Sequence, residues 1–243
     1  MASDHFDVLI LNARPAAGKS EIIAFLRLTP DDERLKQFHI GPFVEIDDFP
    51  MLWAWFEEDA ILERLGHPRL HSTPDQYFQF EGLWHVLIER ISLEYAKLAR
   101  DQPDLHDRRT VIIEFSRGAG HGGYQAAYTH LSETILRRAA ILYLDVPFEE
   151  SLRKNRRRFN PDRPDSILEH ALSDEKLERL YREDDFKTLA DADAGYLTIN
   201  GVRVPYVIFD NHDDVTTDKP DQLAGRLVDR LDVLWSLYRR ATT

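Results

Sequence analysis

The chain has 243 residues, a formal net charge of −12 and no cysteine. This length suits one large α/β domain with an inserted lid, so we expect a single domain over residues 1–243. The acidic balance disfavours binding along a nucleic-acid backbone, because such binding needs clustered Lys and Arg. The lack of cysteine excludes disulfides, thiolate nucleophiles and thiolate metal sites.

The sequence shows no feature of a secreted or membrane protein. Its N-terminus lacks a basic and apolar signal region, and no apolar run approaches the length of a membrane span. We therefore expect a soluble, cytoplasmic protein that has no membrane partner. The oligomeric state is left open by the sequence.

The stretch from Phe6 to Phe25 has the order of strand, short loop and amphipathic helix that a phosphate-binding loop requires. Val8 to Leu11 is an aliphatic run typical of a central parallel strand. The loop ends in Gly18-Lys19-Ser20, and apolar residues recur on one face of the following helix. In such a loop, consecutive backbone N–H groups surround a polyphosphate at the positive end of the helix.

The loop residues have predicted roles in binding ATP and Mg²⁺. Lys19 would place a positive charge between the terminal phosphates, and Ser20 would offer its hydroxyl to Mg²⁺. The motif is degenerate, because Ala13 stands where the usual G-x-x-x-x-G-K-[ST] pattern has its first glycine, and Pro15 lacks an N–H group. The residues predicted to contact the nucleotide are Ala13, Arg14, Pro15, Ala16, Ala17, Gly18, Lys19 and Ser20.

The remaining elements are predicted from the period of the apolar residues. We expect a polar turn at Pro30–Arg34, and one buried stripe from Tyr77 to Leu98 indicates a long helix. Asn200-Gly201 predicts a hairpin within 196–205. Other strands are expected at 42–46, 110–115, 140–145 and 206–209, and other helices at 51–66, 124–138, 147–158 (ended by the break at 160–165), 165–187 and 220–240.

This alternation of strands and helices predicts a three-layer α/β/α fold with a parallel five-stranded core sheet. Two excursions leave the core. We expect 51–105 to form a helical insertion on the substrate side and 147–195 to form a lid.

Polar residues stand near the carboxyl ends of the predicted strands, where parallel α/β sheets bind ligands. Asp47 and Asp48 follow the second strand, and either could instead cap the next helix. Glu114 lies within the third strand and would be costly to bury unpaired, so we expect it to bind Mg²⁺ or, alternatively, to form a salt bridge with Arg117 or another nearby basic residue. Asn211 follows the last strand.

A cluster of basic residues ends the helix after the fourth strand. These side chains would bind phosphates with strong charge-assisted contacts, or they would complement the negative end of the helix. The cluster consists of Arg153, Lys154, Arg156, Arg157 and Arg158.

The arrangement resembles that of the P-loop kinases of nucleotides and small molecules, the adenylate-kinase-like group, with a degenerate Walker A motif. The resemblance implies a P-loop NTPase fold with an acid after the second strand and an acid, sometimes with an Arg, on the third. It also implies lid arginines that clamp the transferred phosphoryl group, and an adenine contact after the fifth strand. The matching positions are Asp47 or Asp48, Glu114 with Arg117, Arg153 with Arg156 and Arg157, and Asn211. Residues 51–102 and the hairpin lie outside the resemblance and would choose the acceptor.

We therefore expect an ATP-dependent kinase that transfers the γ-phosphoryl group to a nucleoside, a nucleotide or another metabolite. Asp47 or Asp48 would orient or deprotonate an acceptor hydroxyl. A phosphate acceptor would need no base, and Arg69 or Arg117 would then be more important. The alternatives are a nucleotide-binding switch or pseudokinase, and a polynucleotide-end kinase, which the net charge disfavours.

Overall fold

The computed structural model describes residues 4–158 and 172–241. Within these residues, one sheet of six strands has the order β2-β3-β1-β4-β6-β5. The bounds are β1 Val8–Ala13, β2 Phe43–Asp47, β3 Thr110–Phe115, β4 Ala139–Asp145, β5 Tyr196–Ile199 and β6 Val202–Asp210. All neighbours from β2 to β6 are parallel, and only β5 runs antiparallel to β6. The predicted parallel five-stranded core is confirmed, with one antiparallel strand added at its edge.

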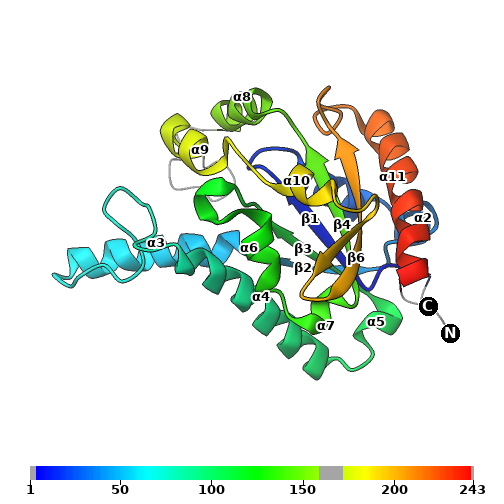
Figure 1. Cartoon of the computed structure of the whole chain (residues 1–243), viewed down its shortest axis with the longest axis horizontal. Coiled ribbons are helices and arrows are strands. Elements are labelled where there is room, and N and C mark those ends of the chain that lie inside the picture. Colours follow the sequence, from blue (N-terminus) through cyan, green and yellow to red (C-terminus); the bar gives the residue numbers. More distant parts are fainter. Residues whose placement is uncertain (1–3, 159–171, 242–243) are drawn as a thin grey trace.

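Helices cover both faces of this sheet (Figure 1). The described helices are α1 Lys19–Leu28, α2 Asp31–Phe38, α3 Phe49–Arg64, α4 Gly82–Asp101, α5 Leu105–Arg108, η1 Ala119–His121, α6 Gly123–Thr129, α7 Glu133–Leu136, α8 Phe148–Arg158, α9 Asp174–Tyr181, α10 Phe186–Ala190 and α11 Pro220–Ala241. One core cluster joins the sheet to α1, α2 and α11, and the other joins it to α4, α6, α7 and α10. The fold is therefore the predicted three-layer α/β/α arrangement.

The central strand β1 is apolar along most of its length because both of its faces are covered. Val8 and Ile10 pack into the core beneath α4 and α6, whereas Leu9 and Leu11 pack into the core beneath α1 and α11. This double burial holds the carboxyl end of β1, and the loop that follows it, at the middle of the sheet.

Two predictions between the strands were wrong. Pro30–Arg34 is not a polar turn, because the acidic residues Asp31, Asp32 and Glu33 form the first turn of α2, where they complement the positive helix end. The single helix predicted at 124–138 is divided into α6 and α7. The Ser132 hydroxyl accepts a hydrogen bond from the Ile135 N–H at 3.4 Å and so starts a second helix.

Two further helices are shorter than predicted. Helix α4 begins only at Gly82, so Tyr77 and Phe80 belong to the preceding loop rather than to its buried stripe. The described part of the helix predicted at 165–187 consists of α9 and α10, separated by residues 182–185. Residues 165–171 of that prediction, and the break predicted at 160–165, lie outside the described residues.

The predicted hairpin is confirmed. Asn200 and Gly201 have φ values of 49° and 78°, the left-handed conformation that a tight two-residue turn requires. The second arm of the hairpin continues into the last sheet strand, and together they form β6.

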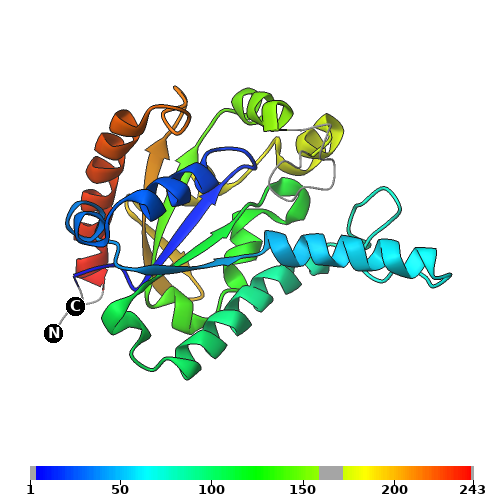
Figure 2. The ribbon, with the colours of Figure 1, turned by 180° about the vertical axis from the view of Figure 1, so that it is seen from behind.

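Helix α3 and the loop after it extend away from the sheet, as both views show (Figure 2). Helices α8 and α9 lie near the loop that follows β1 (Figure 1). No helix of the described residues is long and apolar enough to cross a bilayer.

Candidate functional site

The loop between β1 and α1 contains two residues in the left-handed region, Ala16 with φ 55° and Gly18 with φ 110°. A Cβ atom added at Gly18 would lie 2.5 Å from the Thr216 hydroxyl oxygen. Both the backbone conformation and the lack of space therefore require glycine at this position. Lys19 and Ser20 begin α1, where Lys19 is half-buried and Ser20 is exposed.

Arg14 connects this loop to the region of α8 and α9. Its Nε donates to the Tyr181 carbonyl at 3.0 Å, and its Nη1 donates to the Val146 carbonyl at 3.1 Å. Its Nη2 also lies 2.9 Å from Asp184 Oδ2. The Arg14 side chain, predicted to contact nucleotide, is thus bound to the protein on three sides.

Three carbonyl groups of the loop accept hydrogen bonds from side chains outside it. The Tyr124 hydroxyl donates to the Ala13 carbonyl at 2.9 Å, and the Ser151 hydroxyl donates to the Pro15 carbonyl at 2.7 Å. Asn211 Nδ2 donates to the Ala17 carbonyl at 3.0 Å. These hydrogen bonds hold the backbone carbonyl groups of the loop in place, and one of them comes from the buried side chain of Asn211.

An acidic cluster lies beside the loop at the ends of β2 and β3. The strand register sets Asp47 next to Glu114, and Lys19 reaches this strand end, where its Nζ donates to the Ser116 hydroxyl at 2.7 Å. Burial raises the pKa of Asp47 to about 8, and the carboxylates of Glu114 and Asp48 add to this rise. Burial also raises the pKa of Glu114, although the charge of Lys19 opposes the shift.

Arg117 is fully buried and pairs with Asp48, with 2.7 Å between Nη1 and Oδ2. It also donates to the Trp84 carbonyl at 3.0 Å, and its guanidinium lies 5.2 Å from the Trp84 ring centroid. The ion-pair partner of Arg117 is therefore Asp48 rather than Glu114. Asp48 is the N-cap residue of α3, but its side chain makes no capping hydrogen bond. Asp47 Oδ1, one residue earlier, accepts a hydrogen bond from the Phe49 N–H at 3.0 Å.

The arginines of α8 form ion pairs near the surface. Arg153 pairs with Glu150 and Asp214, and Arg156 pairs with Asp174. Arg157 is exposed. In this conformation, the carboxylates rather than a ligand neutralise the two paired arginines.

The fit of Mg²⁺ to the site rests on Glu114. Its Oε2 is buried and has no hydrogen-bond partner among the described residues. In that part of the chain, no three His, Asp or Glu side chains are grouped to hold a metal ion by themselves. Mg²⁺ bound together with nucleotide phosphates needs only one or two protein ligands, since phosphate and water oxygens complete its shell. Glu114 and the exposed Ser20 hydroxyl fit that requirement.

The sequence analysis did not identify several residues that hold the loop. Ser116 binds Lys19, Tyr124 binds Ala13, and Thr216 accepts hydrogen bonds from Lys154 and Asn211. Ser116 directly follows β3, so its place at a strand end was a usable signal. Tyr124 and Thr216 reach the loop only through tertiary packing, and no local pattern identifies them.

The sequence matches no protein-family model and no curated protein. Among solved structures, the chain is similar to a sugar kinase from Janibacter sp. HTCC2649, with 14% identity, 96% of this chain and 98% of that chain covered and a TM-score of 0.42. The protein TT1252 from Thermus thermophilus has 14% identity, coverage of 96% and 97% and a TM-score of 0.42. A ParA family ATPase from Chlorobium tepidum TLS has 15% identity, coverage of 99% for both chains and a TM-score of 0.27.

Proposed function

We propose that this protein is an ATP-dependent phosphotransferase that acts on a small molecule. The observation that carries the proposal is the position of the loop 13–20 beside the acidic cluster of Asp47, Asp48 and Glu114, which are half-buried or buried. Lys19 lies at the carboxyl ends of the parallel strands, next to two carboxyl groups with raised pKa values. Perturbed titratable groups at this edge of an α/β sheet are typical of active sites.

The loop would hold the β- and γ-phosphates at the start of α1, where backbone N–H groups and the helix dipole favour negative charge. Lys19 would exchange its bond with Ser116 for contact with the phosphates. Because the loop carbonyls are already bound to Tyr124, Ser151 and Asn211, the loop would need little rearrangement on binding.

Glu114 and Ser20 are the residues that would hold Mg²⁺. The ion would supply charge neutralisation between the β- and γ-phosphates. The Glu114 Oε2 atom is buried and has no hydrogen-bond partner among the described residues. Binding to Mg²⁺ would remove the free-energy cost of leaving it unpaired.

Asp47 is the proposed residue that orients the acceptor hydroxyl and takes its proton as the oxygen attacks the γ-phosphorus. Asp48 suits this role less, because it is ion-paired with the buried Arg117. With a pKa near 8, Asp47 is a strong base once it is ionised, and it becomes ionised as the pH approaches 8. A hydroxyl acceptor is favoured over a phosphate acceptor because Arg117 and Arg69 are both paired with carboxylates.

The basic residues of α8 would contribute only after a movement. Arg153 and Arg157 would contact the transferred phosphoryl group and Arg156 the nucleotide, once Arg153 and Arg156 leave Glu150 and Asp174. The Asn211 side chain donates to the Ala17 carbonyl of the loop 13–20. The adenine contact proposed at this position would therefore come from the backbone around Asn211.

A thermal-shift screen followed by a turnover assay tests the proposal. ATP with Mg²⁺ should raise the unfolding temperature, because a ligand that binds only the native state stabilises it. ADP release should then depend on the acceptor, across nucleosides, sugars and other hydroxyl compounds. Lys19→Ala should abolish this release, while Lys36→Ala, a change at an exposed lysine of α2, should leave it unchanged. A well-folded Lys19→Ala protein with normal turnover would refute the proposal.

A second candidate is a nucleotide-binding switch without transfer activity. The ion pairs of Arg153 and Arg156 favour it, because they keep these cations from a phosphoryl group. Tight ATP binding without ADP release, for every acceptor tried, would support this alternative.

A further inference from the structure

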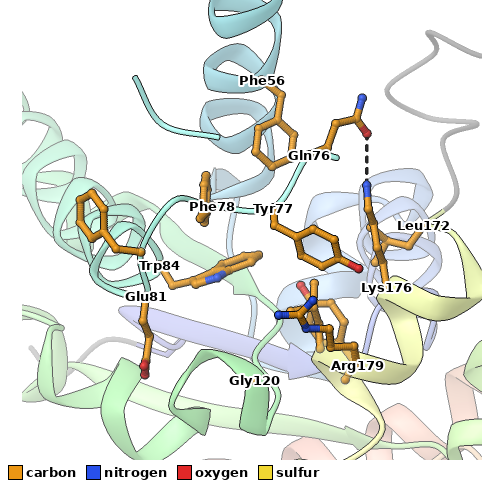
Figure 3. Close-up of a pocket in the computed structure, with 13 residues that line it drawn as sticks. Phe56, Gln76, Tyr77, Phe78, Glu81, Trp84, Gly120, Leu172, Lys176 and Arg179 are labelled. Atoms are coloured by element: carbon orange, nitrogen blue, oxygen red, sulfur yellow. Dashed lines mark hydrogen bonds between the residues drawn. The ribbon is translucent and has the colours of Figure 1, made fainter. Parts of the chain in front are cut away.

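A cavity of about 170 Å³ lies between the segment before α4 and helix α9 (Figure 3). Aromatic rings from four parts of the chain line it: α3, the loop after it, α4 and α9. The rings are Phe56, Tyr77, Phe78, Phe80, Trp84 and Tyr181.

The aromatic wall is held by ring contacts. The Phe78 ring meets the Trp84 ring edge to face at 4.7 Å, and the Phe56 ring lies 5.4 Å from the Phe78 ring. On its other side, Trp84 stacks on His121 at 3.9 Å. The wall is therefore supported from behind, and a flat ligand would meet a surface already in place.

The size of the cavity limits the ligand. An apolar cavity of about 150 Å³ is known to hold benzene, so a cavity of this size suits one ring rather than a fused purine. The surface that its lining exposes is mainly apolar, so a sugar would bury hydroxyl groups without hydrogen-bond partners and would bind more weakly. A single aromatic ring fits this wall better than a sugar does.

Two cations lie at the same cavity. Lys176 Nζ and the guanidinium of Arg179, both from α9, are 5.3 Å and 4.6 Å from the Tyr77 ring centroid. Among the described residues, neither cation forms an ion pair with a carboxylate. Partial burial lowers the pKa of Lys176, although the charges of Asp75 and Glu175 oppose this shift. Arg179 is exposed. An anionic group on the ligand would form charge-assisted contacts with both cations.

The cavity is connected to the proposed phosphoryl-transfer site through its own wall. Tyr181 lines the cavity, and its carbonyl accepts the Arg14 Nε of the phosphate loop. Trp84 also lines it, and its carbonyl accepts from Arg117, the partner of Asp48. Tyr181 therefore connects the cavity directly to the loop, and Trp84 connects it through Arg117 to Asp48 of the acidic cluster.

We propose that this cavity binds the phosphoryl acceptor and that the acceptor carries one aromatic ring joined to an anionic group. The ring occupies the space between Tyr77, Phe78 and Trp84, and the anion, a carboxylate or a phosphate, lies at Lys176 and Arg179. The role of this ligand as phosphoryl acceptor rests on the proposed phosphotransferase function, whereas its chemical class rests on the cavity alone.

Calorimetric titration with simple probes tests the ligand chemistry without nucleotide. Phenylacetate has the ring and the anion, acetate has only the anion, and benzyl alcohol has only the ring. Glucuronate replaces the aromatic ring by a sugar ring, and indole-3-acetate replaces it by a fused pair of rings. Phenylacetate should bind most tightly of the five. Phenyl phosphate, measured in the Lys19→Ala variant to weaken binding at the loop, shows whether phosphate serves as well as carboxylate.

Two variants locate the binding. Leu180→Trp, at a half-buried position of α9 in the cavity wall, should fill the space and abolish phenylacetate binding. Arg179→Gln should weaken it about tenfold or more, since it removes a charged hydrogen bond to the anion. Arg137→Gln, at an exposed arginine directly after α7, is the matched control and should bind normally. Thermal unfolding confirms that each variant is folded.

The outcomes separate this inference from the proposed function. Phenylacetate binding that Leu180→Trp abolishes, with no ATP binding, would refute the kinase proposal and leave the ligand class standing. ATP binding without phenylacetate binding would overturn the ligand class and leave the kinase proposal standing. The ligand class would also be overturned if glucuronate bound as tightly as phenylacetate, or if the folded Leu180→Trp variant bound phenylacetate as the wild type does.

Discussion

Asp59 and Asp47 are both acidic residues of the region around α3, yet their environments shift their pKa values in opposite directions. Burial alone would raise the pKa of Asp59, but hydrogen bonds from the Ser72 hydroxyl and the N–H groups of residues 70–72 outweigh it and lower the pKa to about 2. Asp47 accepts one backbone N–H and faces Glu114, and burial raises its pKa to about 8.

The difference lies in the number of donors. Hydrogen-bond donors of the protein stabilise the negative charge of Asp59. Its role is therefore structural, because it holds the loop whose residues Tyr77 and Phe78 form part of the cavity wall. Asp47 and Glu114 are half-buried without enough donors for two negative charges, so they need a proton or a cation from outside. A buried carboxyl group without partners indicates a ligand site, whereas a buried carboxylate with partners indicates structure.

The largest expected effect is on turnover when Glu114 loses its charge. Glu114→Gln should reduce kcat by about 10² or more and should raise the Mg²⁺ concentration needed for activity, since it removes the proposed ligand of the ion. Glu45→Gln, at an exposed carboxylate of β2, is the control and should have little effect. Normal turnover with an unchanged Mg²⁺ dependence in Glu114→Gln would place the metal elsewhere.

Asp47→Asn should reduce turnover by about 10² while ATP affinity stays near the wild-type value, because a general base contributes about 10²–10⁴ and acts on the acceptor. Steady-state kinetics and nucleotide titration measure the two quantities. A variant that loses both ATP affinity and stability would show that Asp47 serves only to cap α3.

The two acids should also change stability with pH in opposite ways. Because Asp47 has a folded pKa near 8, above its ordinary value of 3.8, the native state holds the extra proton and the free energy of unfolding falls as pH rises from about 4 to 8. Asp59 has a folded pKa near 2, so its stabilisation is present above about pH 4 and is lost as pH falls towards 2.

Substitution should separate these contributions. Asp47→Asn should flatten the decline of stability between pH 4 and 8. Asp59→Asn should lower the free energy of unfolding by about 1–3 kcal/mol at neutral pH, since it leaves buried N–H donors poorly paired. Denaturant unfolding over this pH range measures both changes. The opposite result would contradict the contrast between the two acids. In that result, Asp59→Asn would flatten the decline of stability between pH 4 and 8, and Asp47→Asn would lower the free energy of unfolding at neutral pH.

The smallest effects are expected for α8, because its arginines are exposed and exposed ion pairs contribute only about 0–1 kcal/mol. An ATP analogue with Mg²⁺ should slow amide hydrogen exchange in α8 and α9 if the arginines exchange their carboxylates for phosphates. Arg156→Gln should reduce turnover a few-fold. Equal exchange with and without bound analogue would argue against closure and leave these arginines as surface charge.

The sequence predicts the layers, the parallel core and the loop well, because continuous apolar runs and the Gly18-Lys19-Ser20 pattern are local signals. It places Glu114 and Asp47 at strand ends, but the pairing of Arg117 with Asp48 depends on the tertiary arrangement of the segments that follow β3 and β2. Tyr77 was assigned to a helix because its spacing matched the stripe of α4. Only the fold around Asp59 shows that it belongs to a loop facing α9, and so the cavity had no sequence signal.

The most direct test of the central claim is a calorimetric titration of ATP in the presence and absence of Mg²⁺, with wild type, Lys19→Ala and Lys36→Ala. The account predicts Mg²⁺-dependent binding by wild type and Lys36→Ala, tighter for ATP than for AMP. Lys19→Ala should lose at least about tenfold in affinity, since a charged contact to phosphate is worth about 1.5–3 kcal/mol. Equal affinity for AMP and ATP, or normal ATP affinity in folded Lys19→Ala, would contradict the claim that residues 13–20 bind nucleotide phosphates.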